Sequence, residues 1–320
     1  MKTFSIGGLK TLSDENRLRL LNLLLFQELN VQELTEILGI GQSRVSRHLK
    51  QLSDGGFVRS RRDGLWAYYR AVDDGEPRRL LDAISYLFEE EEIYRADRRF
   101  AREQLKAGRL ATRRFFDAVA SDWEKLRLEI LGELDLTEQI AAAVPEGVVV
   151  ADLGCGSGAL LPSLARTADA VIGIDASERM LVEARRRLER GSVAGVQLRL
   201  GELEHLPMGD GEGDWAIINL VLHHLRTPEL GLREASRVIG PEGGLIVVDF
   251  DRHQEELLRS RYGDRWLGFS REEMTAWLNK SGLRVDETRE LPVKLGLTAV
   301  LWRARKSTGL ESTQKSRSKT

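Results

Sequence analysis

A glycine-rich turn lies between an apolar run and a helical stretch near the middle of the chain. The run Val148–Leu153 predicts a buried strand, and it leads into Gly154-Cys155-Gly156-Ser157-Gly158 and then the stretch Ala159–Arg166. Glycines let the backbone approach a ligand closely, and the N–H groups at a helix N-terminus can hold a carboxylate. The turn therefore predicts a small-molecule site. Because Gly154, Gly156 and Ala159 also match the dinucleotide pattern, a nicotinamide cofactor is one candidate ligand.

A carboxylate follows the next predicted strand. Asp175 ends the apolar run Ala170–Ile174, where it could accept hydrogen bonds from both hydroxyls of a ribose. This contact suits a nicotinamide and other adenosyl ligands equally. Further strands are predicted at Val196–Leu200, Trp215–Leu220 and Leu245–Asp249, and their alternation with helical stretches predicts an α/β sheet.

Cations gather in the N-terminal part of the chain. From Gln42 to Arg70, seven Lys and Arg residues stand against two aspartates, which gives that segment a net charge of +5 and leaves −7 for the rest of a chain whose total is −2. In the predicted helix Ser43–Leu52, apolar residues at 45, 49 and 52 must face inward, which turns a polar stripe outward. The stripe suits base edges and phosphates in a DNA major groove, and its residues are Ser43, Arg44, Arg47, His48 and Gln51.

Helices and one hairpin are expected to position this stripe. One helix carries leucines at 18, 21, 24 and 25, and a second begins at Asn30 and ends before Gly39. The runs Phe57–Arg62 and Leu65–Arg70 are separated by Asp63-Gly64, a strong hairpin signal. The order predicts a mainly α winged helix-turn-helix, whose wing carries three cations toward the DNA, namely Arg59, Arg61 and Arg62.

Composition bounds the remaining possibilities. The chain is 42% hydrophobic and 31% charged, which is ordinary for a folded protein of about two domains. No apolar run is long enough to span a membrane, residues 1–16 lack a signal-peptide core, and Cys155 is the only cysteine, so a cytoplasmic protein is expected. We predict a DNA-binding domain at 1–90, a charged helical connector at 91–112, an α/β domain at 113–305 and a disordered tail at 306–320.

The N-terminal residues resemble a known family. The segment Gln42–Leu52, followed by Gly55-Gly56-Phe57-Val58, is similar to the recognition helix and wing entry of ArsR-type bacterial repressors. The resemblance implies a homodimer with recognition helices roughly 34 Å apart on a palindromic double-stranded operator. The thiolate pair of metal-sensing members has no counterpart in Glu33–Ile37, which argues against metal sensing there. The candidate dimer surface is an apolar face made of Leu80, Leu81, Ile84, Leu87 and Phe88.

The second half of the chain resembles the class I S-adenosylmethionine-dependent methyltransferases. The likeness implies a Rossmann-like sheet with helices on both faces, and it favours S-adenosylmethionine or S-adenosylhomocysteine over a nicotinamide. Four motifs in the family's order carry it, namely Asp152–Gly158, Asp175-Ala176-Ser177 with Met180-Leu181, Gly201-Glu202 with Leu206-Pro207, and Gly243-Gly244 before the strand at 245–249.

The methyltransferase resemblance also implies where the ligand lies. Asp152 and the loop glycines Gly154, Gly156 and Gly158 would hold its amino-acid end, and Asp175 its ribose. Glu202 and the Leu203 amide would meet the adenine amino group, with Ala176 and Met180 against the ring and Asn219 at the end of the fourth strand. The aromatic segment Phe115–Arg127 resembles a lid over the ligand, and plain core packing is its alternative.

Two histidines follow the fourth strand, where a methyl acceptor would sit. His223 or His224 could deprotonate an acceptor, or both could simply pack at the start of a helix. Together with His205 they are not expected to bind a metal, because no carboxylate or thiolate stands at ligand spacing in the sequence.

The whole chain resembles ArsR-type repressors fused to a methyltransferase domain, among them S-adenosylhomocysteine-responsive regulators of the methionine cycle. The resemblance implies a DNA-binding transcriptional regulator, expected to be a repressor, whose second domain binds the adenosyl ligand as an effector. The alternative is an active methyltransferase for a small molecule with an attached DNA-binding module.

Overall fold

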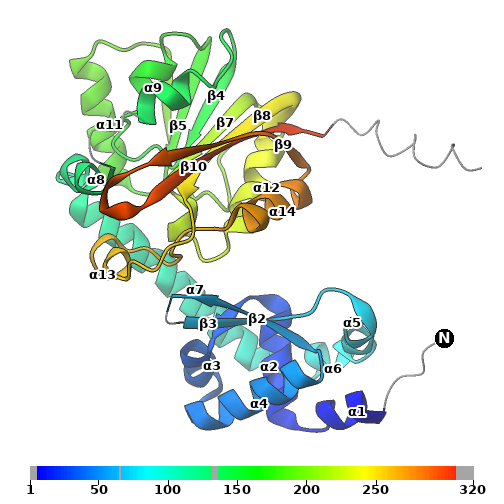
Figure 1. Cartoon of the computed structure of the whole chain (residues 1–320). Coiled ribbons are helices and arrows are strands. Elements are labelled where there is room, and N and C mark those ends of the chain that lie inside the picture. The colour runs from blue at the N-terminus through cyan, green and yellow to red at the C-terminus, as the bar shows by residue number, and fades with distance from the viewer. Residues whose placement is uncertain (1–5, 65, 132–135, 308–320) are drawn as a thin grey trace, which may run out of the picture. The chain divides into compact units, whose positions relative to one another are not determined.

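The chain divides into two compact units. A computed structural model describes residues 6–64, 66–131 and 136–307, without the side chains at positions 105, 109 and 295 (Figure 1). The first unit is Met1–Leu110 and the second is Ala111–Thr320. The division falls within helix α7 (Glu92–Val119), whose N-terminal part carries most of the predicted connector. Among the described residues, no helix combines the length and the apolar character that crossing a bilayer requires.

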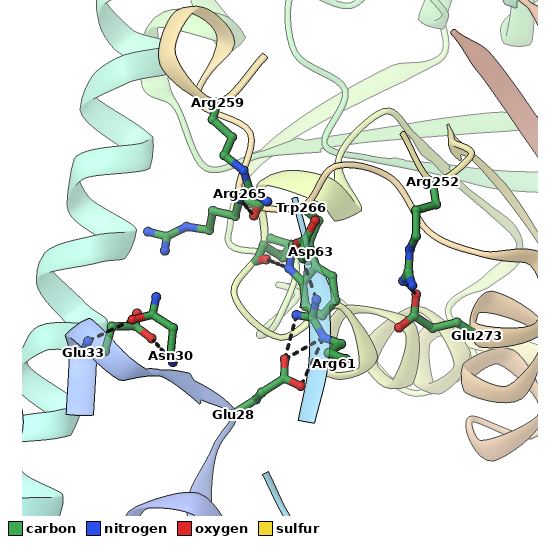
Figure 2. Close-up of polar contacts among 11 residues, drawn as sticks. Glu28, Asn30, Glu33, Arg61, Asp63, Arg252, Arg259, Arg265, Trp266 and Glu273 are labelled. Atoms are coloured by element: carbon green, nitrogen blue, oxygen red, sulfur yellow. Dashed lines mark hydrogen bonds and ion pairs between the residues drawn. The ribbon is translucent and has the colours of Figure 1, made fainter. Parts of the chain in front are cut away.

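Local capping signals set the helices of the first unit. They are α1 (Ile6–Leu12), α2 (Glu15–Phe26), α3 (Val31–Leu38) and α4 (Gln42–Asp54). Helix α3 begins at Asn30, whose side chain accepts from the Glu33 N–H while the Glu33 carboxylate accepts from the Asn30 N–H, as Figure 2 shows. It ends at Gly39, which adopts φ 65°, a conformation that glycine reaches without strain. Both predicted ends of this helix are confirmed.

The wing is a three-stranded antiparallel sheet. Strands β1 (Leu29–Asn30), β3 (Trp66–Ala71) and β2 (Val58–Asp63) follow in that spatial order. Asp63 pairs with Trp66, so Asp63 belongs to β2 and not to the predicted Asp63-Gly64 turn. Gly64 supplies a positive φ of 56°, and Leu65 lies outside the described residues. The predicted hairpin is confirmed, but the predicted turn position is wrong for Asp63, because this residue is buried and continues the strand.

Two short helices complete the packing of the first unit. They are α5 (Gly75–Ala83) and α6 (Ser85–Glu90). Leu80 and Leu81 are buried in the same apolar cluster as the helix-turn-helix, and Phe88 is fully buried with its ring 5.2 Å from that of Tyr94. The interpretation of these three side chains as a dimer surface is therefore wrong, because their own chain already covers them. Ile84 and Leu87 remain half-buried.

A seven-stranded mixed sheet forms the second unit. Its order is β6-β5-β4-β7-β8-β10-β9; the first five strands are parallel to one another, and β10 runs antiparallel to both of its neighbours, β8 and β9 (Figure 1). The bounds are β4 (Val149–Leu153), β5 (Ala170–Asp175), β6 (Val196–Leu200), β7 (Gly213–Asn219), β8 (Ile239–Phe250), β9 (Leu283–Pro292) and β10 (Thr298–Lys306). Strands β5 and β7 lie on opposite sides of β4, so the carboxyl end of β4 is the point where the winding reverses and a ligand crevice is expected.

Helices cover both faces of this sheet, as predicted. Ile217 and Ile246 belong to one apolar cluster, whereas their neighbours Ile218 and Val247 belong to the other. This alternation is typical of a sheet that is buried on both sides. One face is packed by α8 (Trp123–Leu131), α9 (Leu136–Ala141), α10 (Leu161–Leu164), α11 (Glu178–Arg190) and α13 (Leu257–Tyr262), and the other by α12 (Pro228–Val238) and α14 (Arg271–Lys280). Two 3-10 turns, η1 (Leu222–His224) and η2 (Lys294–Gly296), complete the unit.

The C-terminal boundary needs one correction. Lys306, predicted as the first residue of a disordered tail, is the last residue of β10, and its Nζ donates to the carbonyl oxygen of Ile239. Residues 308–320 of the predicted tail lie outside the described residues.

The Asn30 cap provides a test of the first unit. We expect Asn30→Ala to lower the free energy of unfolding by about 1 kcal/mol, because the first N–H groups of α3 lose their acceptor. Gln32→Ala, an exposed substitution on the same helix, is the control and should change the free energy of unfolding by less. Chemical denaturation of both variants provides the measurement, and equal effects would contradict the assigned cap.

Candidate functional site

Helix α4 presents a polar face because its apolar side chains are fully buried. Val45, Leu49 and Leu52 lie in the core of the first unit, and the predicted DNA-facing residues Ser43, Arg44, Arg47 and Gln51 are exposed. The Gln51 side chain accepts from Arg17 Nη1 at 2.9 Å, which orients its amide. Lys50 and Arg70 are exposed as well, although the predicted set of contact residues omitted them.

His48 does not belong to the exposed stripe. Its side chain is buried, and its Nδ1 lies 3.8 Å from a carboxylate oxygen of Asp14. The prediction that it faces outward is wrong because positions 45, 48, 49 and 52 together form one continuous helical stripe. That spacing was visible in the sequence.

The three wing cations have different surroundings. Arg62 is exposed, and Arg59 is exposed with ion pairs to Asp73 and Asp74 at 3.5 and 2.7 Å. Arg61 is largely buried, and its guanidinium binds both carboxylate oxygens of Glu28 (Figure 2). Its guanidinium carbon also lies 4.6 Å from the centre of the Tyr68 ring. We therefore correct the expectation that Arg61 extends toward DNA: in this structure it fastens the wing to the residue before β1.

The glycine loop after β4 has the conformation that only glycine adopts easily. Gly154, Gly156 and Gly158 have φ values of 82°, 53° and 75°. A Cβ atom at Gly154 would lie 2.5 Å from Val221 Cγ2, and one at Gly158 would lie 2.9 Å from Ala184 Cβ. Both backbone strain and space therefore require glycine at the two outer positions.

Asp175 fastens this loop to the end of β5. Its carboxylate accepts from the Gly156 N–H at 2.9 Å and from the Ser177 N–H at 2.8 Å. Ser177 in turn caps α11 by accepting from the Met180 N–H at 3.1 Å. Burial raises the pKa of Asp175, and the backbone N–H groups of Ser177, Gly156 and Ala176 oppose that shift. An ionised carboxylate has about four acceptor sites, so a site for a ribose hydroxyl remains.

Asp152 is buried, and in contrast to Asp175 its carboxylate receives no backbone hydrogen bonds from the described residues. No described residue donates a hydrogen bond to its carboxylate, and burial together with the charge of Asp175 raises its pKa to about 7. On the adjacent strand β7, the side-chain oxygen of Asn219 is buried and unpartnered among the described residues. Two acceptors without donors at the carboxyl edge of neighbouring strands fit the ammonium group of an amino-acid ligand.

The predicted adenine contacts come from the same edge of the sheet. Ala176 is half-buried, and Glu202 is exposed on the turn after β6. Met180 and Leu203 are buried, and Leu203 packs in the apolar cluster under α12. Glu202 therefore has an exposed side chain to offer, whereas Leu203 can meet a ligand only through its backbone.

An aromatic wall lies against the glycine loop. The Phe116 ring packs edge-on against Trp123 and against His224, with centroid distances of 5.3 and 4.8 Å. A Cβ atom at Gly156 would lie 3.7 Å from the Trp123 indole nitrogen. Glu124 accepts from the Ser157 hydroxyl at 2.5 Å. The segment Phe115–Arg127, predicted as a lid over the ligand, is thus in contact with the glycine loop.

The two histidines form a buried charged cluster. His223 Nδ1 lies 2.6 Å from Asp249 Oδ1, and His224 Nδ1 lies 3.3 Å from the Gly263 carbonyl oxygen. Asp264 Oδ1 lies 3.7 Å from His223 Nε2 and 3.6 Å from His224 Nδ1. Burial lowers the pKa of His223, but the two aspartates overcome it and raise the value to about 9. Burial and the charge of His223 hold the pKa of His224 well below its usual range.

Sequence reasoning missed both aspartates of this cluster. They stand 26 and 41 residues after His223, so spacing along the chain could not reveal them. His205, by contrast, is exposed on the turn after β6 and is not part of the cluster. No carboxylate stands at ligand spacing in the sequence, but the fold brings Asp249 and Asp264 beside the histidine pair.

Comparison with known proteins identifies both units. A family model for bacterial regulatory proteins of the arsR family matches residues 14–60, and a methyltransferase-domain model matches residues 151–247. The chain therefore contains an ArsR-family helix-turn-helix domain and a class I methyltransferase domain. A chain in the complex between the Haloferax volcanii Trm112 methyltransferase activator and a methyltransferase shares the fold of the second unit, with a TM-score of 0.51, 21% identity, and coverage of 59% of this chain and 97% of that one.

Two curated relatives match parts of the chain. An uncharacterized 37.1 kDa protein in transposon TN4556 of Streptomyces fradiae is 42% identical over 103 residues, which are 31% of this chain and 29% of that protein. A demethylmenaquinone methyltransferase of Tropheryma whipplei is 34% identical over 142 residues, which are 43% of this chain and 58% of the relative. The chain thus spans less than two thirds of either relative.

The pKa of Asp152 predicts how ligand affinity depends on pH. At pH 6 the carboxyl is mostly protonated and at pH 8 mostly ionised, so S-adenosylhomocysteine, with its ammonium group, should bind about tenfold more tightly at pH 8. Asp152→Asn should weaken binding and remove this difference. Calorimetric titration at both pH values provides the measurement, and a pH dependence that is identical in the variant would contradict the role of Asp152.

Proposed function

We propose that this protein is a cytoplasmic, DNA-binding transcriptional regulator, acting as a repressor, whose methyltransferase domain binds S-adenosylmethionine or S-adenosylhomocysteine as an effector. The observation that supports it most directly is the pairing, in one chain, of an exposed basic recognition helix with a cradle whose buried carboxylate lacks a partner. Burying a carboxylate without a partner costs free energy, which an adenosyl ligand would offset. The exposed basic helix would bind a different ligand, the DNA phosphates and bases.

On the DNA side, the proposal uses the exposed residues of α4 and the wing. Arg44 and Arg47 would reach base edges or phosphates, with Ser43 and Gln51 beside them, while Arg62 and Arg59 would contact the backbone. A homodimer would place two copies of α4 about one helical turn apart, roughly 34 Å, on a palindromic operator. Because Leu80, Leu81 and Phe88 are buried, a homodimer would use a surface other than these three side chains.

On the ligand side, the amino-acid end of the adenosyl ligand would lie against Asp152 and the glycine loop, and its ribose against Asp175. The charged cluster supports an effector role over catalysis, because His223 and His224 are both buried and already have polar neighbours. An imidazole in that state is poorly placed to take a proton from an incoming acceptor.

Coupling requires only that the ligand prefers one geometry of the dimer. A preference of about 1–3 kcal/mol would change DNA affinity by roughly 5- to 150-fold. Helix α7, continuous from Glu92 to Val119, is the segment through which we propose that the two units communicate.

The second candidate is a working methyltransferase with an attached DNA-binding module. The likeness to a demethylmenaquinone methyltransferase over 142 residues favours it. Methyl transfer depends mainly on in-line placement of the acceptor, so a general base is not required. An S-adenosylmethionine turnover assay on extracts of small molecules distinguishes the two: a methylated product whose formation is lost in Asp152→Asn supports the enzyme.

Two variants separate the proposed activities. With an operator selected from random duplexes, S-adenosylhomocysteine should change the retention of wild-type protein on DNA by at least fivefold in a gel-shift assay. Asp152→Asn should bind DNA but ignore the ligand, whereas Arg47→Ala should bind ligand normally and lose at least tenfold in DNA affinity. Indifference of the wild-type protein to both adenosyl ligands would overturn the effector role.

A further inference from the structure

A compact set of nitrogen and oxygen donors lies beneath the aromatic wall of the second unit. His223 and His224 come from η1, directly after β7, and Asp264 comes from the segment that follows α13. All three side chains are buried. One ligand atom from each lies within 4.8 Å of the other two.

The two donor separations that involve Asp264 are close to those around a bound metal ion. Asp264 Oδ1 lies 3.7 Å from His223 Nε2 and 3.6 Å from His224 Nδ1. Ligand bonds to zinc of about 2.0–2.2 Å place neighbouring donor atoms roughly 3–3.5 Å apart. Both separations that involve Asp264 would therefore close by a few tenths of an ångström, and the separation between the two imidazole nitrogens, which lie within 4.8 Å of each other, by more.

Two buried carboxylate oxygens beside the histidines lack hydrogen-bond partners in the part of the chain that the structure describes, which is an independent indication of a cation site. The second carboxylate oxygens of Asp249 and Asp264 are buried and have no hydrogen-bond partner among the described residues. Asp249 is fully buried and Asp264 nearly so. These two carboxylates lie beside the same imidazole, that of His223. Buried charge without compensation is strongly unfavourable, and a divalent cation would supply it.

Asp249 also gives His223 the orientation of a metal ligand. Its carboxylate lies 2.6 Å from Nδ1, which leaves Nε2 directed toward Asp264. Metal-binding histidines in proteins usually donate their other ring nitrogen to a carboxylate in this way. His224 would coordinate through Nδ1 as the neutral imidazole, with the metal bond replacing the 3.3 Å contact with Gly263.

We propose that His223 Nε2, His224 Nδ1 and a carboxylate oxygen of Asp264 form a binding site for a divalent transition-metal ion. Two imidazoles and one carboxylate suit zinc or ferrous iron rather than magnesium or calcium, which prefer oxygen ligands. The inference is independent of whether the methyltransferase domain is a sensor or an enzyme.

The bound ion would fasten one wall of the ligand cradle. Coordination would join η1 to the segment after α13, and η1 is preceded by Val221, which lies against Gly154. His224 is also the residue on which Phe116 packs. Occupancy of this site would therefore stabilise the second unit and hold the wall beside the glycine loop.

Titration of the full chain without an affinity tag tests the site. After chelator treatment and dialysis, we expect the protein to bind one Co²⁺ per chain with visible ligand-field absorption that Zn²⁺ removes. Zn²⁺ should also raise the midpoint of thermal unfolding, because it binds the folded state. Absence of Co²⁺ and Zn²⁺ binding at micromolar concentrations would overturn the proposal.

Variants assign the ligands. Asp264→Asn removes the charge at nearly constant shape, and His224→Gln removes one nitrogen ligand; each should weaken Co²⁺ binding at least tenfold and abolish the thermal shift. His205→Gln, which removes an exposed imidazole outside the cluster, should leave both unchanged. If Asp264→Asn fails to fold, His224→Gln decides. Equal binding by His224→Gln and His205→Gln would overturn the assignment.

Discussion

The hydrogen bonds from Gly156 and Ser177 to the Asp175 carboxylate are the constraint on which the ligand cradle depends. They join the ends of β4 and β5 at the point where the sheet reverses its winding, and they hold three glycines in conformations that other residues avoid. Asp175 is thereby satisfied by the protein itself. Asp152, two residues before the loop, is buried, and no described residue donates a hydrogen bond to its carboxylate, so a cationic group bound beside it would be stabilised.

The orientation of the recognition helix α4 is likewise set by burial. Burial of Val45, Leu49 and Leu52 fixes the rotation of α4, and that rotation exposes Arg44 and Arg47. The first unit does not need DNA in order to fold, and the clustered positive charges of the two arginines would bind an anionic partner such as DNA. The first unit thus exposes the charged groups proposed to bind its ligand, Arg44 and Arg47, whereas the second unit buries its own, the Asp152 carboxylate.

Local signals were sufficient to predict most elements and the glycine turn after β4. Asn30 and Gly39 bound α3 through their own side-chain and backbone chemistry, and the glycines after β4 are needed for reasons that the motif itself contains. What could not be predicted depends on residues distant in the chain. Arg61 is held by Glu28, and the histidine pair gains two aspartates from β8 and from the segment after α13. The sequence of an apolar face such as Leu80-Leu81 does not reveal whether the same domain or a partner protein covers it. His48 was wrongly predicted to be exposed because it is a polar residue at a buried position of α4.

We propose that the binding of DNA and the binding of the adenosyl ligand are energetically coupled, and thermodynamic reciprocity tests this coupling most directly. Whatever factor the adenosyl ligand applies to DNA affinity, DNA must apply to ligand affinity. We therefore expect the dissociation constant of S-adenosylhomocysteine, measured by calorimetry, to change by roughly 5- to 150-fold when the protein is saturated with its selected operator. A dissociation constant that is the same with and without operator, in a protein that binds both, would contradict the account.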